Sequence, residues 1–135
     1  MIKIVLIQDL NLFQDLKEEW SELTKVSDHI NANLTWEWVN VWLKYFRNEG
    51  QLWILLARDE QTQKLVGIAP LFKTKVKDKL YLSYRQIGFI GSTHHHEYLN
   101  FIVQKGLEQE VIPKFIEFLQ SQKHAWDTLQ FSGIK

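Results

Sequence analysis

The first part of the chain changes from a short apolar run to a helical pattern. The run Ile4–Ile7 is shorter than the ~7–15 apolar residues of a signal peptide core, so it predicts a buried strand. Asn11, which has a glutamine three residues later, is the expected N-cap of a helix that follows. The apolar positions of that helix recur every three or four residues, at Phe13, Leu16, Trp20 and Leu23.

A second helix is predicted over residues 35–47. Thr35 suits its N-cap, and Gly50 follows as a stop signal. Trp36 lies away from the apolar stripe of this helix, which is formed by Trp38, Trp42 and Tyr45. We therefore expect Trp36 to be the exposed tryptophan and a candidate substrate-binding residue. We expect the other tryptophans to fill the space between helix and sheet.

The middle of the chain has the patterns of strands. Residues 52–58 are almost all apolar, which predicts a strand covered on both faces. Residues 65–72 follow a polar turn and are its expected hairpin partner. Two further strands are predicted over 80–84 and 97–103.

The last third returns to one helix and one strand. Apolar spacing predicts a helix from Glu108 to Gln122, with Pro113 in its first turn, where the missing amide costs little. Residues 126–131 are the final strand, and the element order is β-α-α-β-β-β-β-α-β. Because a helix joins the last two strands, we expect them to pair in parallel through a right-handed crossover.

Composition limits the classes of function. The chain has 135 residues, which fits a single domain over 1–135, with sixteen basic and sixteen acidic side chains. The absence of cysteine excludes disulfides, a cysteine nucleophile and a cysteine-based zinc site. The chain has zero net charge, so it lacks the excess of basic residues that is typical of proteins that bind nucleic acid or a membrane surface. No apolar stretch reaches the ~18 residues of a membrane span, and we expect a cytoplasmic location.

Three consecutive histidines, His94, His95 and His96, precede Glu97. In an extended segment the imidazoles of His94 and His96 lie on the same face, so with the nearby Glu97 carboxylate they could bind a metal ion or act as acid and base. Adjacent histidines on one ribbon seldom converge on one ion without another ligand, so we predict no metal site. An acid–base or substrate role and a solvated loop remain alternatives.

Two other segments offer binding chemistry. Glycines between Arg85 and Ser92 would let the backbone approach a phosphate, but no helical pattern follows Gly91, and this favours a turn or bulge. Lysines alternate further upstream, and they could meet a polyanion or an acidic partner or face solvent on a hairpin. These lysines are Lys73, Lys75, Lys77 and Lys79.

Four segments form a characteristic series along the chain: the paired-tryptophan helix at 35–42, an LVG…PL strand at 65–71, a G…DYLD-like segment at 86–100 and a WD strand at 126–131. In this order they resemble the CelD/BcsL acetyltransferases, a branch of the GNAT superfamily. The resemblance implies a GNAT-like α/β (α+β) fold, with a mixed, largely antiparallel sheet flanked by helices. It also implies acyl transfer from an aminoacyl donor or from a CoA donor, which is acetyl-CoA or another acyl-CoA. It covers the first half of a tandem enzyme, so the chain is expected to be the N-terminal half.

The donor signature of that superfamily is met in part. Arg85 and Gly88 fit its first two positions, but Ile90 stands where a small residue is expected, and Gly91 comes one place late. The catalytic candidates are Glu97, His96 and Tyr98, and the donor-binding candidates are Arg85, Gly88, Gly91 and Ser92. The substrate-binding candidates are Trp36, His94, His95 and Asn100.

Three functions stay open at this stage. The chain is the acceptor-binding or structural half of an N-acyltransferase, a small active acetyl-CoA-dependent N-acetyltransferase, or a noncatalytic module that binds a partner through its lysines. The expected partner is a C-terminal GNAT-like half or a small-molecule acceptor. We do not expect the chain to bind nucleic acid. With a second half missing, apolar surface near the last strand would favour self-association.

Overall fold

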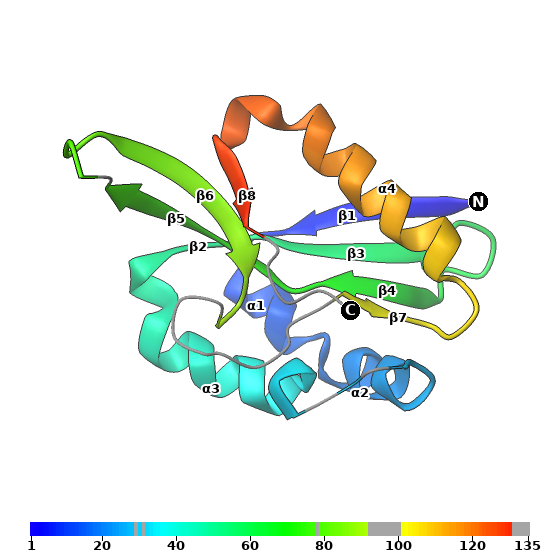
Figure 1. The fold of residues 1–135 in the computed structure, drawn as a ribbon. Coiled ribbons are helices and arrows are strands. Elements are labelled where there is room, and N and C mark those ends of the chain that lie inside the picture. The colour runs from blue at the N-terminus through cyan, green and yellow to red at the C-terminus, as the bar shows by residue number, and fades with distance from the viewer. Residues whose placement is uncertain (29, 31, 78, 92–100, 131–135) are drawn as a thin grey trace.

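The computed structural model describes residues 1–28, 30, 32–77, 79–91 and 101–130 (Figure 1). Its strands are β1 (Ile2–Ile7), β2 (Gly50–Leu52), β3 (Ile54–Asp59), β4 (Leu65–Ala69), β5 (Leu71–Lys77), β6 (Ser83–Phe89), β7 (Ile102–Val103) and β8 (Thr128–Gln130). Its helices are α1 (Leu10–Gln14), α2 (Lys17–Lys25), α3 (Trp36–Phe46) and α4 (Glu108–Ser121). Short 3₁₀ turns are η1 (Ala32–Leu34), η2 (Arg47–Glu49) and η3 (Lys123–Ala125).

The strands form two four-stranded sheets, in the orders β1-β3-β4-β7 and β2-β5-β6-β8. Two long strands pass from one sheet to the other, since β2 is followed by β3 after Trp53 and β4 by β5 after Pro70. The pairs Leu52–Phe72 and Leu55–Ala69 continue one register across this junction. Proline donates no hydrogen bond to a ladder, which accounts for the break at Pro70.

Helices cover both faces of the β1-β3-β4-β7 sheet. Figure 1 shows α4 on one face and α1, α2 and α3 on the other. Alternate residues of β3 enter two cores, with Ile54 and Leu56 on the side of α1–α3 and Leu55 and Ala57 on the side of α4. The prediction of a strand buried on both faces is confirmed, and so is the α/β fold with a mixed, largely antiparallel sheet.

The first predicted helix is two helices in the structure. Helix α1 ends at Gln14 and α2 begins at Lys17, so Leu16 lies between them. The N-cap is Asp9 rather than Asn11, because an Asp9 carboxylate oxygen accepts a hydrogen bond from the Asn11 amide at 2.8 Å. A carboxylate held near the positive end of a helix is a stronger acceptor than the asparagine amide that the sequence favoured.

The expectation that Trp36 is exposed is wrong. Its side chain is buried, at 6% exposed, and its ring stacks on Phe13 with centroids 5.1 Å apart. Its indole Nε1 donates to the Phe13 carbonyl at 3.0 Å. The sequence prediction assumed that only the face of α3 with the apolar stripe is covered. In the structure α1 packs against the start of α3 and covers Trp36 as well. Tyr45, placed on the buried stripe, is 78% exposed.

Two boundaries in the second half also differ from the prediction. The predicted strand over 80–84 overlaps β6 only at Ser83 and Tyr84, because residues 80–82 form a turn in which Tyr81 has φ of +63°. Pro113 lies in the second turn of α4, because the helix begins at Glu108.

The final strand pairs in parallel, as expected, but with a different partner. Strand β8 lies beside β6, with Gln86 opposite Thr128, and not beside the strand that precedes α4. That strand, β7, pairs with β4. The crossover through α4 therefore passes from one sheet to the other.

Candidate functional site

The strands β6 and β7 lie along the same side of the continuous strand β4–β5. The Ile90 amide donates to the Pro70 carbonyl at 2.8 Å, and Ile102 pairs with Ile68. Ala69 is the one residue between these two pairings. The chain leaves β6 and enters β7 beside the bend at Pro70, where the two sheets meet.

Gly91 and Phe101 border the segment that contains most of the candidate residues. If the registers of β6 and β7 are extended, both residues fall beside Ala69. Gly91 has φ of +91°, and a Cβ there would lie 2.6 Å from Cη2 of Trp38. Backbone conformation and space both require glycine at this position, as expected for a turn at the end of a strand.

A narrow cleft lies next to this junction, on the α3 side of β5 and β6. Two donor-binding candidates, Gly88 and Gly91, line it together with the directly paired polar residues Thr74 and Gln86. Its free volume is about 10 Å³, which is the space of one water molecule. The remaining lining residues are Trp42, Phe72 and Phe89. The sequence prediction missed Thr74 and Gln86, since only the cross-strand register places them together.

Arg85 lies apart from that cleft. It is an odd number of residues from Gly88 in the same strand, so the two point to opposite faces of β6. Its guanidinium binds Asp127, with Nη2 3.1 Å from Oδ1, and donates to the His124 carbonyl at 2.9 Å. Hydrogen bonds from the Arg85 side chain and then from its backbone amide lower the pKa of Asp127. Arg85 therefore ties β6 to the segment that enters β8.

The start of α4 carries negative charge. A helix N-terminus that follows a strand can hold phosphate on its amides. Here the first turn contains Glu108 and Glu110, and the Glu108 carboxylate accepts a hydrogen bond from the Gly106 amide at 2.9 Å. These groups stabilise the helix dipole and repel an anion. The described residues therefore do not fit the pyrophosphate of an acyl-CoA at this helix.

The remaining candidates lie outside the described residues. They are Ser92, His94, His95, His96, Glu97, Tyr98 and Asn100, and their roles stay predictions, as does donor binding by Arg85, Gly88 and Gly91. Trp36 belongs to the core between α1 and α3 rather than to the cleft. Among the residues that the structure describes, no three histidine or carboxylate side chains gather where they could hold a metal ion.

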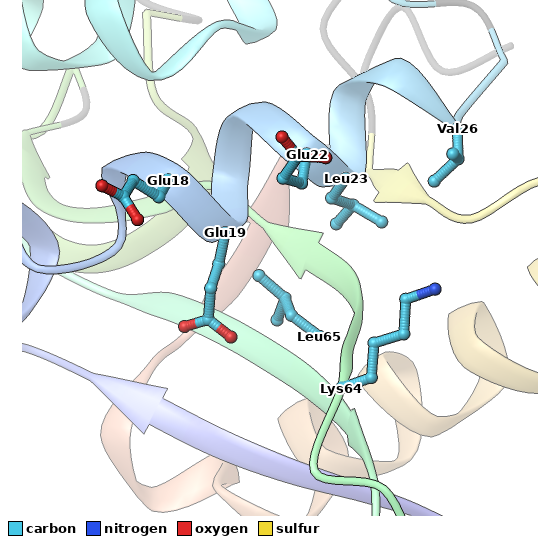
Figure 2. Close-up of a pocket in the computed structure, with 7 residues that line it drawn as sticks. All are labelled: Glu18, Glu19, Glu22, Leu23, Val26, Lys64 and Leu65. Carbon is cyan, nitrogen blue, oxygen red and sulfur yellow. The ribbon is translucent and has the colours of Figure 1, made fainter.

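A larger, shallow cavity of about 330 Å³ lies between α2 and the beginning of β4 (Figure 2). Three carboxylates from α2, those of Glu18, Glu19 and Glu22, line it opposite Lys64. Glu19 is bound by both guanidinium nitrogens of Arg58, at 2.7 and 3.0 Å, and these hydrogen bonds lower its pKa. Lys25 lies 3.2 Å from the Glu22 carboxylate, so the charges around the cavity are largely balanced. The sequence prediction missed it because Glu19 and Arg58 are far apart along the chain.

Comparison with known proteins shows the fold. No family model matches the chain, and no curated protein matches it. Among solved structures, glucosamine-6-phosphate N-acetyltransferase from Arabidopsis thaliana matches 100% of this chain and 82% of its own, with 12% identity and a TM-score of 0.53. A probable acetyltransferase matches 98% of this chain and 78% of its own, with 15% identity and a TM-score of 0.55.

A Trypanosoma brucei acetyltransferase matches 100% of this chain and 82% of its own, with 11% identity and a TM-score of 0.51. The chain has the GNAT fold. This is the fold that the sequence resemblance also implied, and the match extends over the parallel pair β6–β8 and the helix α4 that leads into it. At such low identities the likeness concerns architecture alone. In the described part of the chain, no helix is long and apolar enough to cross a membrane.

Proposed function

We propose that this chain is an acyltransferase-type GNAT domain of the CelD/BcsL kind that acts in the cytoplasm. In this proposal it is the N-terminal half of an N-acyltransferase, where it binds the acceptor or braces the catalytic half. Two independent observations support the general class. Four segments resemble that branch in the correct order, and solved acetyltransferases match the fold over almost the whole chain.

The observation that carries the noncatalytic role is the acidic start of α4. A donor with a pyrophosphate group needs bare amides and positive potential at a helix N-terminus. In this chain Glu108 occupies the Gly106 amide, and Glu110 adds a second negative charge in the same turn. Ile90, in place of a small residue, is a further departure from the donor signature.

One observation favours the second candidate, a small active acetyl-CoA-dependent N-acetyltransferase. Gly88 and Gly91 line one cleft, beside the polar pair Thr74 and Gln86. In that alternative, loop amides hold the donor, and Glu97 or a loop histidine removes the proton from the acceptor amine.

Calorimetric titration of the chain with acetyl-CoA distinguishes the two. The noncatalytic proposal predicts no measurable binding to the chain as it is. Replacing both carboxylates, as Glu108→Gln with Glu110→Gln, removes the repulsion and should raise the affinity for acetyl-CoA. Glu117→Gln with Glu49→Gln makes the same change of charge away from the start of α4, and it should leave binding undetected.

Micromolar affinity in the unmodified chain would overturn the proposal, provided that the Gly88→Glu variant loses it and keeps its circular dichroism spectrum. If Gly88→Glu unfolds, Gln86→Glu tests the same cleft from a side chain that is already half-exposed.

A further inference from the structure

The hairpin of β5 and β6 extends beyond both of its neighbours. Strand β2 pairs with β5 only as far as Thr74, and β8 pairs with β6 only from Gln86 onward. Within the described residues, Lys75–Lys77 and Ser83–Tyr84 therefore have ladder partners only in each other's strand, whereas the Arg85 carbonyl also accepts a hydrogen bond from the Asp127 amide at 2.8 Å. We call residues 75–77 and 79–85 the arm, which projects from the body of the molecule in Figure 1. Two-stranded ribbons are marginally stable alone, so such an arm gains from a surface that covers it.

The end of the arm is apolar and exposed. Leu80, Tyr81 and Leu82 are consecutive, and 77%, 84% and 63% of their surfaces are exposed. Tyr81 has φ of +63°, a left-handed conformation that is uncommon for a residue with a bulky side chain. Three large apolar side chains in a row at an extremity are unfavourable in water and mark a contact surface.

Positive charge lies directly behind this apolar end. Between Leu71 and Arg85 the sequence has five basic residues and one acidic residue, although the whole chain is neutral. Lys73 is occupied, since its ammonium donates to the Ala125 carbonyl at 2.9 Å. Lys75, Lys77 and Lys79 are exposed and form no ion pair within the described residues.

Two positive side chains also face each other across the arm. Lys75 is paired directly with Arg85 in the ladder between β5 and β6. Like charges in opposite positions destabilise a sheet, and Asp127 relieves this cost on the Arg85 side only. An anionic surface against the arm would relieve it on the Lys75 side as well.

We propose that the arm docks on a membrane surface that carries anionic lipids. The order along the arm is apolar residues at the end and lysines behind them, which is the order of acyl chains and headgroups that an inserting segment meets. Lysine stems also place their charge at the headgroup level while the methylene groups stay in the apolar layer.

A protein partner fits the same surface less well. Three side chains cover far less than the about 800 Å² that each partner buries in a standard protein interface, and lysine is depleted at interface centres. The zero net charge of the chain does not oppose membrane docking, because charges beyond about 8 Å are largely screened at physiological salt. The local excess of positive charge on the arm therefore determines its attraction to anionic lipids.

Co-sedimentation with phosphatidylcholine vesicles, with and without phosphatidylglycerol, tests the proposal. The chain should bind only the vesicles with phosphatidylglycerol, and added salt should release it. Replacing Lys75, Lys77 and Lys79 with glutamine should weaken binding by about two orders of magnitude, roughly fivefold per lysine. Lys3→Gln, Lys44→Gln and Lys105→Gln together make the same charge change elsewhere and should reduce binding much less.

The apolar end has its own matched variants. Leu80→Ser with Leu82→Ser should abolish binding, whereas Val41→Ser with Tyr45→Ser, which changes exposed apolar residues of α3, should not. The chain has no cysteine, so Ser83→Cys accepts a single environment-sensitive dye whose emission should shift to the blue on vesicles. The same dye at Glu60→Cys, in the turn between β3 and β4, should not respond (Figure 1).

Several results would overturn membrane docking. One is equal binding to vesicles with and without phosphatidylglycerol. Another is unchanged binding of the Leu80→Ser, Leu82→Ser variant. A third is an equal loss of vesicle binding in the variant that replaces Lys75, Lys77 and Lys79 and in the variant that replaces Lys3, Lys44 and Lys105. Self-association in sedimentation velocity that the Leu80→Ser, Leu82→Ser variant abolishes would assign the arm to a second copy instead. Each of these readouts is independent of acetyl-CoA binding, so the proposed function can fail without affecting this inference.

Discussion

At the scale of single residues, burial in this protein depends on contacts that the local pattern does not reveal. Trp36 is apart from the apolar stripe of its own helix, and yet it lies in the core because Phe13 of α1 stacks on it. A residue from an earlier helix thus decides which face of α3 is covered. The sequence prediction identified the N-cap Thr35 correctly, because capping is a local interaction.

Replacing Trp36 tests this account of the core. Trp36→Ala should lower the free energy of unfolding by about 3–5 kcal/mol, since it removes a large buried ring. Trp36→Phe keeps an aromatic ring against Phe13, loses the hydrogen bond to its carbonyl, and should cost less. Urea unfolding measures both, and Tyr45→Ala, at an exposed position of the same helix, should stay within about 0.5 kcal/mol of the unmodified chain. Equal effects of Trp36→Ala and Tyr45→Ala would contradict the buried placement.

The pair Glu19–Arg58 should make stability depend on pH in acid. Hydrogen bonds from Arg58 lower the pKa of Glu19 below its usual 4.5, although burial opposes the shift. Because the folded-state pKa is the lower one, the stabilisation is complete above pH 4.5 and is lost as the pH falls through the folded-state value. The pair is partly exposed, so we expect a contribution of at most about 1 kcal/mol.

Unfolding free energies measured over this acid range should fall more steeply for the unmodified chain than for Glu19→Gln. The variant keeps the hydrogen bond from Arg58 to the Gln63 carbonyl, so the difference isolates the carboxylate. Parallel curves for the two proteins would show that the pair adds nothing to stability.

At the scale of elements, close packing of β4 against α4 depends on one glycine. A Cβ on Gly67 would lie 2.6 Å from Cγ1 of Val111 and 3.2 Å from Cβ of Ala57. Valine is branched at Cβ and cannot rotate away easily, so the added methyl group must push helix and strand apart.

We expect Gly67→Ala to destabilise the protein by about 1–3 kcal/mol. Val111→Ala removes the clashing atom, so the double variant should be more stable than the sum of the two single changes allows. A thermodynamic cycle from chemical denaturation gives this coupling energy. Additive effects would show that β4 and α4 do not approach each other as closely as described.

Element types were predictable from periodicity, whereas element partners were not. The helices around Trp42 and Phe115 and the hairpin of 52–58 with 65–72 follow from apolar spacing and turn residues. The pairing of β8 with β6 depends on how α4 crosses between the two sheets. The sequence of residues 126–131 does not by itself indicate the partner strand. The turn at 80–82 was misassigned because its apolar residues look like a buried strand but are exposed.

At the scale of the whole molecule, the sequence predicted the architecture better than the site. The motif order pointed to the GNAT fold, which the solved structures share. The site depends on distances between segments, such as that between Thr74 and Gln86 or between Glu19 and Arg58, and these appear only in three dimensions. Most of the predicted catalytic and substrate-binding residues fall within 92–100 and remain predictions.

The closeness of the end of β6 to the start of β7 also has an evolutionary consequence. The chain leaves β6 beside Pro70 and enters β7 beside Ile68, and these two positions are close together on the continuous strand β4–β5, so the sheet sets no requirement on the length of chain between them. Insertions, deletions and changes of sequence there need not disturb either register or the two cores. This position is therefore one at which a lineage can exchange the connecting segment and keep its scaffold unchanged.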